Sequence, residues 1–153
     1  MKKLNLLTTL ILLILVSCNE KSVDDGYLNL EKKKGVFIAC EGNYMYGNAS
    51  LSFYDKKDKV VYNQIFYARN QAPLGDEAQY LSLKGDNLFI VVGNSGKIVA
   101  ADKNTLEYKG AITGLTSPRA IHIVSSSKAY ISDMLARKIT VVNPGTLQTS
   151  GSI

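Results

Sequence analysis

The sequence contains a repeat of 41 residues. Residues 88–112 and 129–153 align at this offset without a gap. Two aligned pairs, Phe89/Tyr130 and Asp102/Asn143, are similar, and seven pairs are identical: Ile90/Ile131, Lys97/Lys138, Ile98/Ile139, Thr105/Thr146, Leu106/Leu147, Gly110/Gly151 and Ile112/Ile153. A repeat of this length predicts a small structural unit that cannot bury both of its faces alone and therefore stacks against its neighbours.

Each repeat is expected to form four short strands, because β-branched and aromatic residues alternate with turn residues. The strands are expected at 78–83, 88–92, 97–101 and 107–112 in the second repeat, and at 120–124, 128–132, 138–142 and 148–153 in the third. The connections contain Asp, Asn, Pro and Gly, which favour tight turns. A period of about 40 residues that holds four strands is typical of a β-propeller blade.

The first repeat is longer and more divergent. Residues 36–40, 49–54 and 60–66 match the second, third and fourth strands, whereas 27–31 either supply the inner strand or belong elsewhere in a ring. A loop is expected at 67–79, because Pro73 and Gly75 lie within it, with a turn of helix as the alternative. The predicted fold class is therefore all-β: a partial β-propeller of about three four-stranded antiparallel blades at 27–66, 78–112 and 119–153, preceded by a signal-peptide helix.

The N-terminus is expected to be a targeting segment. Lys2 and Lys3 precede an apolar run over 4–16, which is too short to span a bilayer. The run ends in Ser17-Cys18, which resembles a bacterial lipobox. Residues 1–17 are therefore predicted to be a lipoprotein signal peptide, Cys18 the lipidated residue and 18–26 a flexible tether. An ordinary secretory peptide and a buried helix are the alternatives. The expected location is the bacterial outer membrane or cell surface, with attachment through the lipid.

The composition gives no sign of nucleic-acid binding, a disulfide framework or a catalytic site. The net charge is +5 with both signs mixed, which does not indicate nucleic-acid binding. Cys40 is the other cysteine besides Cys18, so no disulfide framework is expected, and it is interpreted as a buried, inert thiol. His122 alternates with two isoleucines and is interpreted as a packed side chain. No pattern indicates a zinc site, a phosphate-binding loop or a catalytic triad, so neither catalytic residues nor a metal are predicted.

Several segments resemble a known family. Residues 128–133 and 139–144 resemble the YVTN-type β-propeller repeat, and the segments at 40–43, 47–55, 73–79 and 117–119 resemble YncE-like surface lipoproteins of Bacteroidetes. The resemblance covers about residues 35–153. Some of these relatives capture cobalamin for an outer-membrane transporter, so the resemblance implies a bound corrinoid and a transporter or surface-protein partner. Such propellers commonly have about seven blades, whereas three cannot close a ring. A fragment of a longer gene and an assembly of several chains, with self-association through open blade edges, both remain alternatives.

Propeller topology places the longer connections on one face. These are 41–48, 67–76, 93–96, 113–118 and 133–137, and they contain aromatic, Met and Arg residues of the kind used in contact surfaces. The predicted ligand-binding residues are Glu41, Asn43, Tyr44, Tyr46, Asn94, Asp133 and Arg137. Asp76, Gln79 and Arg119 are expected either to face the central channel or to cap turns.

The sequence therefore favours a non-catalytic ligand- or protein-binding module. The alternative is a lactonase-like hydrolase in which Glu41, Asn94 and Asp133 imitate a calcium site, although such sites need six or more oxygen ligands.

Overall fold

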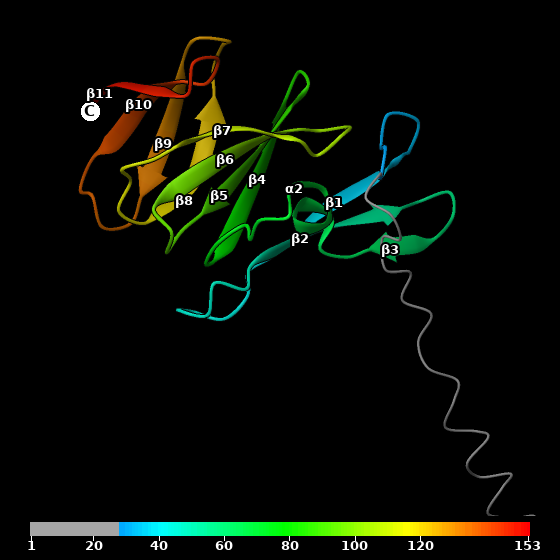
Figure 1. Ribbon diagram of the computed structural model, residues 1–153. Coiled ribbons are helices and arrows are strands. Elements are labelled where there is room, and N and C mark those ends of the chain that lie inside the picture. Colours follow the sequence, from blue (N-terminus) through cyan, green and yellow to red (C-terminus); the bar gives the residue numbers. More distant parts are fainter. Residues whose placement is uncertain (1–27) are drawn as a thin grey trace, which may run out of the picture.

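The computed structural model describes residues 28–153, which form three antiparallel β-sheets arranged side by side in a fan (Figure 1). The predicted signal peptide, Cys18, the tether and Tyr27 lie outside the described residues. Within residues 28–153, no helix is long and apolar enough to cross a membrane. The three neighbouring sheets form part of a ring, and in each sheet the strands follow one another in chain order. This architecture is a partial β-propeller, so the predicted fold class is confirmed.

Each sheet follows the order of its strands in the chain. The first sheet contains three strands: β1 (Gly35–Cys40), β2 (Ser50–Asp55) and β3 (Val60–Tyr62). The second contains β4 (Ala78–Lys84), β5 (Asn87–Val92), β6 (Lys97–Asp102) and β7 (Tyr108–Ile112). The third contains β8 (Pro118–Ile123), β9 (Ala129–Asp133), β10 (Ile139–Asn143) and β11 (Gln148–Ser152).

The 41-residue repeat corresponds to two sheets with the same architecture. A bulge interrupts the first strand of each at equivalent places, between Ala78 and Tyr80 in β4 and between Pro118 and Ala120 in β8. A second bulge interrupts the pairing of the two outer strands in both sheets, after Ala100 and after Val141. The repeat therefore specifies the irregular positions of each sheet as well as its strands.

The core lies between the sheets. On β5, Leu88, Ile90 and Val92 belong to a buried cluster shared with the first sheet, whereas Phe89 and Val91 belong to a cluster shared with the third. Successive side chains of a strand point to opposite faces, so the central sheet is buried on both. Each large side chain buried in this way contributes about 1.5–3 kcal/mol of hydrophobic stabilisation.

One turn recurs in all three sheets, between the last two strands, after β2, β6 and β10. Asp55, Asp102 and Asn143 each accept two backbone N–H groups from residues two and three positions ahead, at 2.9–3.3 Å. A residue with positive φ then ends the turn: Lys59 in the first sheet, Leu106 in the second and Leu147 in the third. The first, divergent repeat therefore keeps the same turn as the other two.

The leucine of this turn packs against the preceding sheet. Leu106 is buried in the cluster shared with the first sheet. Leu147 reaches Gly110 on β7, where its Cδ1 would lie 2.6 Å from a Cβ atom built on the glycine. Gly110 also has a φ of +147°, which L side chains rarely adopt. Gly151 is the equivalent residue of the third sheet, and nothing described lies within 4 Å of its Cβ position.

The outward face of the third sheet is less covered than the matching face of the second. Ile98 and Ile112 are 0% and 1% exposed, whereas their repeat partners Ile139 and Ile153 are 38% and 76% exposed. The difference arises because the third sheet covers the second, while no described residue covers the third.

Two expectations for the first repeat are wrong. The strand expected at 60–66 ends at Tyr62, and the helix α2 (Ile65–Asn70) follows it, so the span from Tyr67 begins with the alternative helical turn and not with a loop. The side chains of Ile65 and Phe66 are buried against the sheets, which favours the helix over the local strand propensity. The Asn70 amide also bridges the carbonyls of Phe66 and Leu106, at 2.9 Å each.

Residues 28–31 form no strand. Leu30 instead enters the core, and its N–H donates to the Asn104 carbonyl at 2.8 Å. Residues 28–31 therefore do not supply the inner strand of the first sheet. Within the described chain, this sheet has three strands.

We expect Gly110→Ala to lower the free energy of unfolding by about 1–3 kcal/mol, because it combines backbone strain with overpacking against Leu147. Gly151→Ala is the matched control, since its surroundings are open, and should change stability by less than about 0.5 kcal/mol. Urea unfolding followed by circular dichroism measures both. Equal losses in the two variants would show that the contact between sheets does not determine the effect.

Asp102 should contribute to stability in a pH-dependent way. Desolvation opposes its charged form, but the Lys109 ammonium and the N–H groups of Thr105 and Asn104 outweigh it and lower the pKa to about 2. A lowered pKa adds stability above the unfolded value of 3.8, and this stability is lost as the pH falls toward 2.

We therefore expect Asp102→Asn, which mimics Asn143 of the third sheet, to keep the turn and reduce the acid sensitivity of the chain. The difference in unfolding free energy between parent and variant should shrink by about 1–2 kcal/mol from pH 6 to pH 2. Urea titrations across this range measure it, and a constant difference would contradict the assignment.

Candidate functional site

The long connections gather at one end of the fan, which we call the loop face: residues 41–49, 63–77, 93–96, 113–117 and 134–138 (Figure 1). Backbone hydrogen bonds join neighbouring connections. Ala49 donates to Gly75, Leu115 to Gly96 and Met134 to Ser117, at 2.9–3.1 Å. The loop face is therefore one connected surface in which each connection is tied to the next.

Asp76 joins three of these connections. Its carboxylate Oδ2 accepts the Met45 N–H at 2.7 Å and the Asn94 side-chain amide at 2.5 Å, while its own N–H donates to Ser95 Oγ at 2.9 Å. Asp76 is 8% exposed, and its Oδ1 is buried with no partner among the described residues. Of the two alternatives for Asp76, turn capping matches these contacts. The side chain of Asn94, which is a predicted ligand contact, takes part in the same set of hydrogen bonds.

Asp133 plays a similar part in the third sheet. Its carboxylate accepts four backbone N–H groups, from Thr116 and Ser117 on one side and from Leu135 and Ala136 on the other, at 2.8–3.1 Å. Desolvation opposes its charged form, but the four donors outweigh it and hold the pKa of Asp133 below its usual value. Asp133 therefore ties two loops together.

Two polar pairs lie where the inner strands begin. Glu41 Oε1 accepts the Gln79 amide at 3.0 Å. In the third sheet, the Arg119 guanidinium lies 3.3 Å from the Met134 sulfur. Gln79 and Arg119 occupy the equivalent bulges of β4 and β8, so the fold presents a polar side chain at the same place in consecutive sheets.

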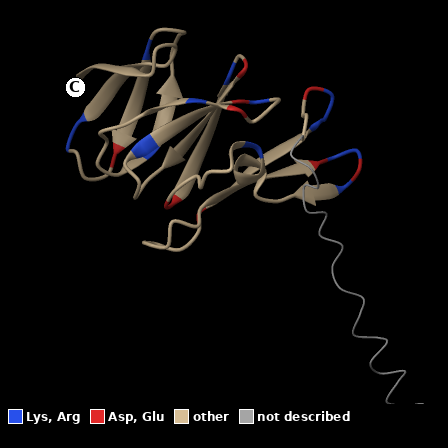
Figure 2. Ribbon diagram, in the orientation of Figure 1, with Lys and Arg blue, Asp and Glu red and all other residues tan. Residues whose placement is uncertain are grey.

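The tip of the first connection is the most exposed apolar surface on this face. Tyr44, Met45 and Tyr46 are 63%, 76% and 77% exposed. The segment 42–48 has no charged residue, whereas charged side chains gather in the turns at the other end of the sheets (Figure 2). Asn43 supports the tip, because its N–H donates to Asn48 Oδ1 at 2.8 Å and its carbonyl accepts the Tyr46 N–H.

Other connections of the loop face also expose apolar side chains. Tyr67 in the connection 63–77, and Met134 and Leu135 in the connection 134–138, are each at least half exposed. Arg137 is exposed in the same turn as Met134 and has a φ of +50°. The sequence did not single out Leu135 or Ser95 as site residues. The signal that could have indicated them was their position within the loops 133–137 and 93–96. A small cavity of about 160 Å³ lies beneath Tyr67, between residues 47–51 and 73–74.

The residues proposed for a calcium site do not converge. Glu41, Asn94 and Asp133 each engage a different partner, and no group of three or more His, Cys, Asp or Glu side chains within residues 28–153 could hold a metal ion. His122 is exposed on β8, in contrast to the expected packed histidine. Cys40 is half-buried, with its sulfur 3.6 Å from Ser52 Oγ, so the thiol is less enclosed than expected.

A family model described as Domain of unknown function (DUF5074) matches residues 34–153. The chain belongs to this family. No curated protein matches the chain. Among solved structures, the fold is similar to that of a chain of Kuenenia stuttgartiensis hydrazine synthase, with a TM-score of 0.55 and 16% identity over 67% of this chain. This chain spans only 29% of that one, and at this identity the likeness bears on the fold alone.

We expect Asp76→Ala to loosen the loop face of this DUF5074 domain without unfolding it. The Met45 N–H and the Asn94 amide would lose their acceptor, so the Met45 amide should exchange with deuterium at least ten times faster. Unfolding free energy should fall by about 1–3 kcal/mol. Asp86→Ala, which removes an exposed carboxylate from the other end of the sheets, is the control and should leave Met45 exchange unchanged.

Proposed function

We propose that this protein is a non-catalytic binding module that presents its loop face to a ligand or protein at the bacterial cell surface. The observation that carries the proposal is the uncharged, aromatic tip Tyr44-Met45-Tyr46, held on a rigid support by Asp76. Aromatic and Met side chains offer large contact areas, and a rigid support reduces the entropy lost on binding.

Binding is favoured over hydrolysis by how the carboxylates of this face are used. Asp133 and the Oδ2 atom of Asp76 accept hydrogen bonds from backbone and amide donors within the loops, Asp76 Oδ1 is buried, and Glu41 pairs with Gln79. A general base or a metal ligand needs an oxygen that faces the substrate. These contacts instead fix the shape of a surface.

A corrinoid is our leading candidate ligand, supported by the resemblance to cobalamin-capturing lipoproteins. The cavity of about 160 Å³ beside Tyr67 would admit only a small group. A corrinoid is much larger than this cavity, so it would lie across the exposed tyrosines and methionines. A protein or glycan partner on the cell surface is the competing candidate, and the broad, open form of the apolar surface suits it as well.

Lipidation at Cys18 would place the module at the membrane, next to the outer-membrane transporter or surface protein that receives the ligand. A single lipid attachment with a tether would leave the loop face free to reach such a partner.

We expect the full-length protein to bind cyanocobalamin with a saturable change in the corrin absorption spectrum. Tyr44→Ala and Tyr46→Ala should each weaken binding about tenfold, because each removes a stacking surface worth about 1–1.5 kcal/mol. Spectroscopic titration and isothermal calorimetry measure both effects.

Tyr108→Ala is the matched control, because Tyr108 is also about half exposed but lies on β7, outside the tip formed by residues 44–46. Its backbone N–H, which donates to Asn70, is kept in this variant. Absence of binding in the folded parent would reject the corrinoid and leave the protein or glycan partner. Equal weakening by all three variants would reject the loop face as the site.

A further inference from the structure

Lysines gather at the end of the sheets opposite the loop face (Figure 2). We call this end the turn face, and it comprises residues 28–34, 55–59, 84–87, 102–109, 124–128 and 143–147. The turn face contains ten lysines and six acidic residues. Sheets stack through their faces and not through their turns, so the exposure of this end does not depend on how many sheets the ring holds.

Ion pairs use only some of the lysines of the turn face. The pairs join Lys33 to Asp55 and Asp58, Lys103 to Asp86, and Lys109 to Asp102. The other seven lysines are exposed and have no acidic partner within residues 28–153: Lys32, Lys34, Lys56, Lys57, Lys59, Lys84 and Lys128. Residues 18–27 contribute three acidic residues and Lys21, so a positive excess remains at this end.

Five of these lysines form one patch on the first sheet, which we call the lysine patch: Lys32, Lys34, Lys56, Lys57 and Lys59. The Lys56 N–H donates to the Lys34 carbonyl at 2.9 Å, so the turn at 55–59 lies directly beside residues 32–34. Like charges held this close repel one another, and an anionic partner outside the chain would relieve the repulsion.

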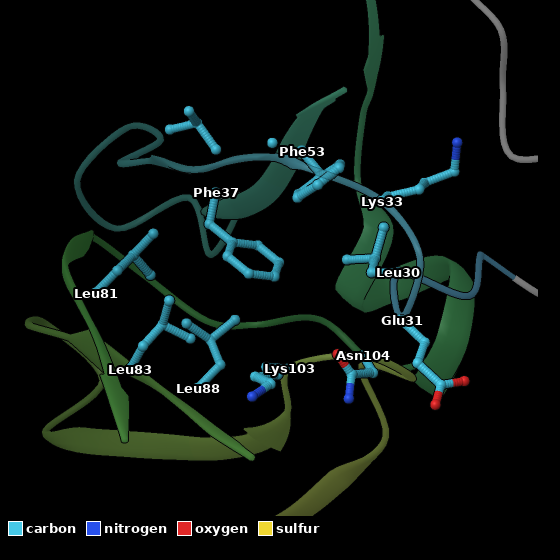
Figure 3. Close-up of a pocket in the computed structure, with 12 residues that line it drawn as sticks. Leu30, Glu31, Lys33, Phe37, Phe53, Leu81, Leu83, Leu88, Lys103 and Asn104 are labelled. Atoms are coloured by element: carbon cyan, nitrogen blue, oxygen red, sulfur yellow. The ribbon is translucent and has the colours of Figure 1, made fainter. Parts of the chain in front are cut away.

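The chain enters the described fold beside the lysine patch. Leu30 is 4% exposed, and its N–H donates to the carbonyl of Asn104 in the turn face (Figure 3). The predicted lipidation site, Cys18, lies ten residues before Leu28. Ten residues span at most about 35 Å. An acyl group at Cys18 would therefore hold the turn face near the lipid headgroups.

We propose that the turn face docks on the anionic headgroups of the membrane that holds the lipid at Cys18. The inference rests on the lipid attachment in the proposed function and adds an electrostatic contact to it. A single acyl chain gives only reversible attachment, and a basic patch beside it supplies the second signal that stable attachment requires. Since the loop face lies at the opposite ends of the strands, this docking points Tyr44 and Tyr46 away from the membrane.

The test uses the full-length protein as the bacterial cell processes it, added to preformed vesicles of phosphatidylcholine alone or with phosphatidylglycerol. Reaction with an amine-reactive reagent, followed by mass spectrometry, measures the labelling rate of each lysine. The lysine patch should label about threefold more slowly on the anionic vesicles, and about 1 M NaCl should remove the difference because it shortens the screening length to about 3 Å. Lys138, which is exposed on the loop face, should label equally on both vesicles.

A triple variant, Lys34→Gln/Lys56→Gln/Lys57→Gln, locates the contact. Within residues 28–153 none of these three side chains makes an ion pair, so the variant should fold as the parent does. On anionic vesicles, Lys32 and Lys59 of this variant should label as fast as they do on neutral ones. Lys97→Gln/Lys138→Gln is the matched control, because it removes two cations from the opposite end of the sheets, and it should keep the protection of the lysine patch.

Two results would overturn the docking: equal labelling of the lysine patch on both kinds of vesicle, or protection that persists in the triple variant. The intact mass of the protein reports the acyl group at Cys18 separately. If that group is absent, the attachment in the proposed function fails, and flotation of the same protein with anionic vesicles decides the docking alone. Salt-sensitive binding would then support it, and no binding would overturn it.

Discussion

Packing between the sheets is the interaction on which this structure depends. A three- or four-stranded sheet of short strands has two apolar faces, and neither face can be buried within the sheet. The second sheet resolves this by lying between the other two, so that alternate residues of β5 serve two separate clusters. The loops and the turns are positioned by how these sheets lie against one another.

Much of this arrangement could be predicted from the sequence, because the repeat reflects the packing directly. Ile90 and Ile131 are identical because they occupy the same place in consecutive sheets, and Leu147 is retained because it fills the space above Gly110. The boundaries of the strands follow from turn residues such as Asp102 and Asn143, which cap the backbone locally. These are short-range or periodic signals, and a single sequence reveals them.

Other features depend on contacts between distant residues and left no such signal. The helix at 65–70 has residues that suit a strand, and it forms because Ile65 and Phe66 find a place in the core. Similarly, the sequence marked Asp76 and Asp133 as polar residues in loops, but not what they bind. Their partners, Met45 and Thr116, lie 31 and 17 residues away. The predicted site residues thus include some that hold the surface together and others, such as Tyr44 and Tyr46, that form its exposed part.

The leucine and glycine that join consecutive sheets also make the assembly directional. Leu147 projects backward onto Gly110, and Leu106 likewise packs toward the sheet before it, whereas Lys59 occupies this position in the first sheet. The second and third sheets therefore each place a turn leucine on the sheet that precedes them in the chain. Because Leu147 meets a glycine of the preceding sheet, this contact favours stacking of consecutive sheets in the order in which they occur in the chain.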